Sequence, residues 1–143
     1  MGILRKKSIG IAITSNSVRA MVLYGNKKEI ITGPYFNVEL SEGAIIDGEI
    51  RNYLELKKAL FSIKKKTGFN KIVLSARTPE TDLFREIGVK IVWFESEQES
   101  AHRAMFFLQD KGTYMMVDIG KERTIISVVS GGEICYSKQI GIN

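Results

Sequence analysis

Two short segments of the chain carry polar groups of the kind that bind phosphate. Each follows an apolar run, the first from Ile9 to Ile13 and the second from Met115 to Val117. Hydroxyls and backbone N–H groups at a strand end can donate to phosphate oxygens, and a glycine there lets the ligand approach the backbone closely. The candidate phosphate-binding residues are Thr14, Ser15, Asn16, Ser17, Asp118, Gly120, Lys121 and Thr124.

Asp118 is also the candidate metal ligand. Mg²⁺ prefers one or two carboxylates together with phosphate oxygens, so an aspartate beside a phosphate-binding turn is well placed to hold the ion directly or through water. A single Asp-x-Gly after a strand is more often an ordinary turn. Its occurrence within a duplicated hairpin is a more specific signal for nucleotide chemistry.

The two segments are copies of each other. At one constant offset, both read as an apolar strand, a polar tip, a second apolar strand and a glycine turn. The tips are short, so each pair of strands must form an antiparallel hairpin. The first copy has Ala12 in the position of Asp118 and Thr14 in the position of Gly120. Only the second copy therefore keeps the carboxylate and the tip glycine.

The elements that carry the first tip follow from apolar alternation and capping signals. Alternation predicts strands at 9–14, 18–24 and 29–40. The third strand should contain a bulge near Pro34, because proline cannot donate to a ladder. A helix is expected to follow, with Asn52 as its cap and Gly68 as its stop.

The middle of the chain alternates strands and helices. Continuous apolar runs at 72–74 and 89–94 are typical of strands buried on both faces. One helix is expected between these runs, from Thr78 to Gly88, and another after the second run, opening at a capping box that begins with Ser96.

This order of elements predicts an α/β fold. Strands joined by whole helices must be parallel, and right-handed crossovers place helices on both faces of one mixed sheet. The sheet would combine a three-strand meander with two parallel strands. Three further strands repeat the opening meander after Gly112, so we expect a first domain at 1–112 and the start of a second copy at 113–143.

Composition narrows the class of protein. The chain has 143 residues, 44% hydrophobic residues and a formal net charge of +5, which fits a globular protein. No aromatic side chains interleave with the basic run Lys64–Lys66, so we expect no nucleic-acid partner. Trp93, Phe94 and the lone Cys135 are expected in the core, and His102 is expected to be a packing or solvated residue.

Longer motifs surround the two tips. They read SIGIAITSNSVRAMVL, GAIIDGEIRN, ESEQESAHRAM and VDIGKERTIISVVSGGEICYSKQIGIN. Together they resemble the actin-like ATPase superfamily, which includes Hsp70 and sugar kinases, and within it the PilM and FtsA branch. The resemblance implies two duplicated ribonuclease-H-like domains that hold ATP and Mg²⁺ between them, with Glu97 and Arg103 at matching helix positions.

The sequence departs from this pattern at three places. Ala12 and Thr14 replace an aspartate and a glycine of the first hairpin. The inserted small subdomain of the family is missing before ESEQESA, and the chain stops where relatives continue into the rest of their second domain. We therefore expect ATP and Mg²⁺ binding to be weak or lost, and no ATPase activity by this chain alone.

The resemblance implies a PilM-like cytoplasmic scaffold of type IV pilus assembly, peripheral at the inner membrane. Its partner would be the cytoplasmic peptide of a PilN-like inner-membrane protein. The alternative is an ATP-binding actin-like ATPase, or an FtsA-like cell-division protein, of which this chain is a fragment or one half. Self-association through the unfinished second sheet is also expected, because it would expose Ile125, Val128 and Ile134.

Overall fold

The computed structural model describes residues 6–25, 29–105, 112–120 and 123–141, arranged in two compact units, Met1–Glu97 and Gln98–Asn143. The strands are β1 (Lys6–Ile13), β2 (Ser17–Gly25), β3 (Ile30–Glu39), β4 (Ile45–Ile46), β5 (Glu49–Ile50), β6 (Lys71–Ser75), β7 (Lys90–Glu95), β8 (Thr113–Ile119), β9 (Arg123–Ser130) and β10 (Glu133–Gly141). The helices are α1 (Tyr53–Thr67), α2 (Thr81–Glu86) and α3 (Glu97–Met105).

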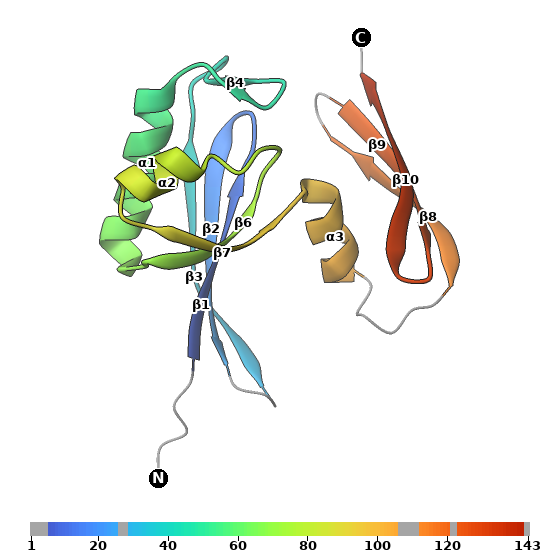
Figure 1. Cartoon of the computed structure of the whole chain (residues 1–143), viewed down its shortest axis with the longest axis horizontal. Coiled ribbons are helices and arrows are strands. Elements are labelled where there is room, and N and C mark those ends of the chain that lie inside the picture. The colour runs from blue at the N-terminus through green and yellow to red at the C-terminus, as the bar shows by residue number, and fades with distance from the viewer. Residues whose placement is uncertain (1–5, 26–28, 106–111, 121–122, 142–143) are drawn as a thin grey trace. The chain divides into compact units, whose positions relative to one another are not determined.

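The first unit is built on a five-stranded sheet with the order β3-β2-β1-β6-β7 (Figure 1). The first three strands pair antiparallel, and β6 runs parallel to both β1 and β7. The ladder between β2 and β3 shifts register between Met21 and Leu23, opposite the Gly33-Pro34 step. The mixed sheet and the bulge near Pro34 are both confirmed.

One face of this sheet forms the core. Side chains alternate along a strand, so Ile9, Ile11 and Ile13 of β1 point to the same face, and all three are buried. Helices α1 and α2 pack on that face, where Leu60 and Phe84 are among the buried residues. Helix α3 groups almost entirely with the second unit, so the opposite face of the first sheet carries no helix of the first unit among the described residues.

Helix α1 has the predicted caps. The Asn52 side chain accepts a hydrogen bond from the Glu55 backbone N–H, and donates one to the Glu55 carboxylate at 2.9 Å. Gly68 ends the helix in the left-handed conformation, with φ of 67°. Tyr53 and Phe61 of this helix are exposed, whereas its buried stripe consists of Leu56, Ala59, Leu60 and Ile63.

The segment before α1 forms a small hairpin. Strands β4 and β5 pair antiparallel around Asp47 and Gly48. Both turn residues have positive φ, 51° and 83°, which a two-residue turn of the I′ type requires. An Asp-Gly pair supplies these angles at low cost, so the GAIIDGEIRN motif encodes a tight turn.

Helix α2 begins later than predicted. Thr78 was expected to cap it, but the Thr78 hydroxyl donates to the Glu80 carboxylate at 2.9 Å and the helix starts at Thr81. Its end is held by α1, because the Lys64 ammonium donates to the backbone oxygens of Ile87 and Gly88. A cation at this position also complements the negative end of the helix dipole.

Strand β7 is less buried than its apolar sequence predicts. Trp93 and Phe94 are 61% and 37% exposed, so their prediction as core residues is wrong. The strand is the last one in the sheet, and its ladder with β6 skips Val92. An edge strand lacks a neighbour on one side, which leaves its larger side chains open to solvent.

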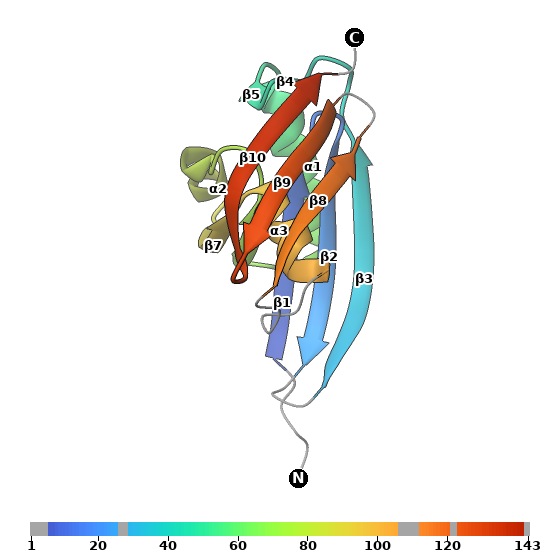
Figure 2. The same ribbon diagram turned by 90° about the vertical axis from the view of Figure 1, so that its right-hand side faces the viewer.

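The second unit contains α3 and a three-stranded antiparallel sheet with the order β10-β9-β8 (Figure 2). His102 of α3 and Tyr114 of β8 share a hydrogen bond of 2.7 Å between Nε2 and the phenol oxygen. His102 is therefore a packing residue, as expected. Cys135 is exposed rather than buried, as are the other residues of the edge strand β10 apart from Ile134. It lies at a shift in the register between β9 and β10.

Candidate phosphate-binding hairpins

The two hairpins have the same register, residue for residue. In the first, Ala12 pairs with Arg19, and at the same offset Asp118 pairs with Ile125 in the second. The tips are closed by equivalent backbone bonds, from Thr14 N to Ser17 O and from Gly120 N to Arg123 O, both 2.9 Å. The duplication read from the sequence is therefore present in the backbone.

The first tip satisfies its own polar groups. The Thr14 hydroxyl lies 3.1 Å from Asn16 Oδ1 and 3.0 Å from Ser17 Oγ, and it accepts a hydrogen bond from the Ser17 backbone N–H. Ser17 is buried, Ser15 is half-buried and Asn16 is exposed. The structure thus brings the four predicted residues together, with Thr14 and Ser17 engaged inside the turn.

The second tip separates its predicted residues. Asp118 is exposed and pairs with Ile125, whereas Thr124 pairs with Ile119, one position further along the ladder. Because successive side chains alternate between faces, Asp118 and Thr124 lie on opposite faces of the hairpin. Lys121 lies outside the described residues.

Gly120 is required by the turn itself. A Cβ atom there would lie 3.0 Å from the Arg123 carbonyl oxygen, which is tighter than side chains usually tolerate. The glycine therefore permits the close backbone approach that closes the tip. Because glycine has no side chain, its backbone is also accessible to a phosphate.

The carboxylates available to a metal are few. Among the described residues there is no group of three or more His, Cys, Asp or Glu side chains that could hold an ion. Asp118 fits the single-carboxylate arrangement that Mg²⁺ accepts when phosphate oxygens complete its shell. The equivalent place in the first hairpin does not fit, because the Ala12 side chain has no oxygen and the residue opposite it is the cationic Arg19.

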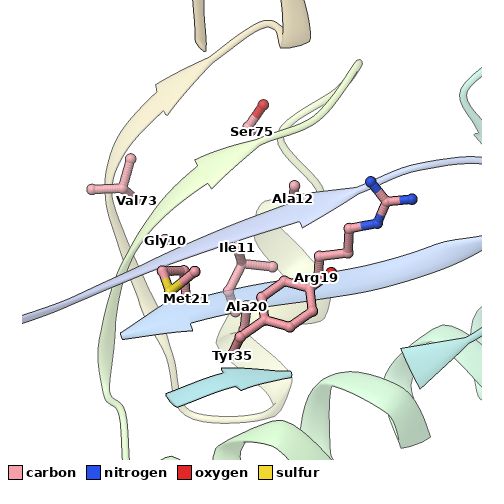
Figure 3. Close-up of a pocket in the computed structure, with 9 residues that line it drawn as sticks. All are labelled: Gly10, Ile11, Ala12, Arg19, Ala20, Met21, Tyr35, Val73 and Ser75. Atoms are coloured by element: carbon pink, nitrogen blue, oxygen red, sulfur yellow. The ribbon is translucent and has the colours of Figure 1, made fainter. Parts of the chain in front are cut away.

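The structure also reveals a pocket that the sequence reading missed. It has a volume of about 270 Å³ and lies on the face of the first sheet away from α1 and α2 (Figure 3). Its lining is Gly10, Ile11, Ala12, Arg19, Ala20, Met21, Tyr35, Val73 and Ser75. The available signal was the alternation of small residues on β1, Gly10 and Ala12, which leaves the centre of that face without large side chains.

Comparisons with known proteins identify structures that share this fold. No family model and no curated protein sequence matches the chain. Solved structures do match it. The chain is similar to the ethanolamine utilization protein EutJ from Carboxydothermus hydrogenoformans, with 17% identity, a TM-score of 0.74, and coverage of 95% of this chain and 52% of that one.

Two further structures extend the likeness. MreB5 of Spiroplasma citri bound to ADP has 17% identity and a TM-score of 0.67, with 96% of this chain and 52% of that chain covered. A PilM-PilN type IV pilus biogenesis complex has 11% identity and a TM-score of 0.68, with 94% and 61% covered.

The chain spans about half the length of the first of these relatives. The matched part holds the mixed five-stranded sheet followed by a second sheet that opens with the same hairpin. At these identities the likeness establishes the fold. The chain has the fold of the actin-like ATPase superfamily.

Proposed function

We propose that this chain is a PilM-like scaffold of type IV pilus assembly, which binds the cytoplasmic peptide of a PilN-like inner-membrane protein. The observation that carries the proposal is the altered first hairpin: Ala12 has no carboxylate, and Arg19 lies opposite it. A protein that keeps the fold but lacks this carboxylate is better suited to binding a partner than to hydrolysing ATP. The likeness to the PilM-PilN complex supports the choice of partner.

The branch assignment has a second support. The GAIIDGEIRN motif, which resembles the PilM and FtsA branch, forms the β4–β5 hairpin directly before α1. In the part of the chain that the structure describes, no helix is long and apolar enough to span a membrane. On this proposal the scaffold reaches the inner membrane through its partner.

A synthetic peptide with the cytoplasmic sequence of PilN tests the scaffold function. We expect the fluorescein-labelled peptide to bind the full chain in fluorescence anisotropy with micromolar affinity, and a scrambled peptide to bind at least about tenfold more weakly, a difference of about 1.4 kcal/mol. Absence of binding by a chain whose circular dichroism shows folded α/β structure would contradict the scaffold function.

A second candidate is a nucleotide-binding protein, favoured by Asp118 and Gly120 in the second hairpin. The matched MreB5 structures are bound to ADP and to AMPPNP. On this alternative, an ATPase or FtsA-like activity belongs to a longer protein of which this chain is one half. Calorimetry with ATP and Mg²⁺ distinguishes the two: we expect weak binding and no phosphate release, and turnover would favour the ATPase.

The second sheet supports self-association. Ile125, expected to be exposed, is buried. The opposite face is apolar and open instead, with Met115, Val117, Ile119, Tyr136 and Ile140 all exposed. Burying such a face against a second copy would remove apolar surface from water. Sedimentation velocity should show concentration-dependent dimers that Ile119→Lys disrupts, and a monomer at all concentrations would contradict this.

A further inference from the structure

The face of the first sheet opposite α1 and α2 has a floor at Gly10, which carries no side chain. Register partners form a row across four strands, in which Tyr35, Met21, Gly10 and Val73 lie side by side. A Cβ atom on Gly10 would meet nothing within 4 Å. Tyr35 and Met21 therefore rise on one side of an open floor and Val73 on the other, which forms the pocket (Figure 3).

A cation stands beside this apolar floor. Arg19 lines the pocket next to Ala12, and its side chain is exposed. Within the described residues the Arg19 guanidinium makes no ion pair or hydrogen bond. Figure 3 shows it extending from β2 on the side of the sheet that carries the pocket. An arginine presents a planar fork of N–H donors that matches a carboxylate.

We propose that this pocket binds an acidic amphipathic peptide segment of a partner protein. One apolar side chain of the peptide occupies the space over Gly10, between Met21 and Val73, and a carboxylate of the peptide pairs with Arg19. The inference deepens the proposed scaffold function and rests on it for the existence of a partner, and it names the chemistry by which that partner is recognised.

The dimensions favour a peptide over a small molecule. The pocket volume of about 270 Å³ lies below the ~300–1,000 Å³ of typical small-ligand sites. Arg19 and Met21 are two residues apart on one strand face, a separation of roughly 7 Å. An apolar residue and an acidic residue one helical turn apart, or two apart in an extended segment, span a comparable distance.

The charge selects the acidic partner. A Mg²⁺ ion would be repelled by Arg19, and a basic peptide would bring like charges together on an exposed surface, which is unfavourable. A carboxylate gains a charge-assisted hydrogen bond, while its apolar neighbour occupies the open space over Gly10. The carboxylate of the peptide therefore matches Arg19, and its apolar side chain matches the floor at Gly10.

Selection from a random peptide library displayed on phage, against the immobilised full chain, tests the proposal. We expect enrichment of peptides with an apolar residue followed two to four positions later by Asp or Glu. Binding of a fluorescein-labelled enriched peptide should weaken at least about tenfold in Gly10→Leu, which fills the floor, and in Arg19→Glu. The controls are Gly141→Leu and Lys71→Glu, which make the same changes outside the pocket and should leave the affinity unchanged.

Charge reversal separates recognition from misfolding. Selection against Arg19→Glu should enrich Lys or Arg in place of the acidic residue, which an unfolded variant cannot do. Enrichment without an acidic preference, or peptides insensitive to both pocket variants, would overturn the proposal. Tighter binding of decanoate, an apolar chain with a carboxylate, than of the enriched peptides would also overturn the proposal. A change in self-association caused by Gly10→Leu would do the same.

The scaffold function and the pocket can fail separately. If the PilN peptide binds and is insensitive to Gly10→Leu and Arg19→Glu, the scaffold function stands and the pocket inference falls for that partner. If enriched acidic peptides bind through the pocket and the PilN peptide does not bind, the pocket inference stands and the partner assignment falls.

Discussion

Arg19 on β2 lies directly opposite Ala12 on β1, in the register position that Ile125 and Asp118 occupy in the second hairpin. The two copies therefore differ in the sign of the charge that their ladders present at one equivalent point. In the second copy the charge is a carboxylate, which attracts metal ions. In the first copy it is a guanidinium, which attracts anions. The two hairpins therefore share one backbone register but favour ligands of opposite charge.

A carboxylate introduced at position 12 should create an ion pair and not a metal site. In Ala12→Asp, the new side chain faces Arg19 across an antiparallel ladder, where opposite charges stabilise by about 0.2–1 kcal/mol. We expect urea denaturation, followed by the fluorescence of Trp93, to show this increase without any dependence on Mg²⁺. Ala12→Asn is the uncharged control. Stabilisation of Ala12→Asp by millimolar Mg²⁺ would contradict the prediction.

Gly48 should be replaced by a residue with a side chain only at a cost in stability. Its φ is 83°, and an added Cβ would come within 2.1 Å of the Arg77 side chain. Arg77 can move, so the backbone conformation sets the cost, and we expect Gly48→Ala to lower the free energy of unfolding by about 1–2 kcal/mol. Gly10→Ala is the matched control. It adds the same methyl group to open space in a strand and should be neutral or stabilising by up to about 1 kcal/mol.

Lys64 should anchor the end of α2 to α1. Its ammonium donates to the backbone oxygens of Ile87 and Gly88, and removal leaves both without this partner. We expect Lys64→Met to lower the free energy of unfolding by about 1–2 kcal/mol. Lys65→Met on the same helix turn keeps both hydrogen bonds and should change stability far less. Equal effects of the two substitutions would argue against the anchor.

The ion pair between Lys57 and Glu86 should make stability depend on pH. The hydrogen bond from Lys57, 2.7 Å long, holds the pKa of Glu86 below its ordinary value, and the same bond raises the pKa of Lys57. A lowered carboxylate pKa contributes stability above the ordinary glutamate value of about 4.3, and that stability is lost as the pH falls through the lowered pKa. The raised lysine pKa acts in the opposite direction, and its contribution is lost only in strong alkali.

Glu86→Gln tests this pH dependence. At neutral pH we expect the variant to melt about 1–3 °C below the parent chain, a small change because the pair is exposed. In acid, where Glu86 becomes protonated in the parent, the two melting temperatures should converge. Glu42→Gln removes an exposed charge elsewhere in the first unit and should show no such convergence. A difference that persists in acid would contradict the role of the pair.

The backbone of the hairpins could be predicted from the sequence, because local patterns determine it. Period-two alternation with a short tip defines both hairpins, and the caps at Asn52 and Gly68 define α1. The identical register of the hairpins follows from equal spacing in the two copies. These features depend only on residues that are close together in the chain.

The exposure of particular side chains could not be predicted in the same way. Cys135 and Val92 lie at shifts in register, and a shift changes which face each later residue occupies. Trp93 is exposed because its strand has only one neighbour in the sheet. The pocket depends on cross-strand neighbours from β1, β2, β3 and β6, a combination that the linear order of residues does not display.

The small core of the second unit has a consequence for local unfolding. Among its described residues the buried ones are Met116, Ile125, Ser127 and Val129, far fewer than line the core of the first unit. A meander with few buried contacts opens at low free energy. In native-state hydrogen exchange, amides of β8 to β10 should therefore exchange through an opening that leaves β1, β2 and β6 protected. Asp118 would then belong to a part of the protein that opens independently, and a ligand that engages it would be detected first as slower exchange in that sheet.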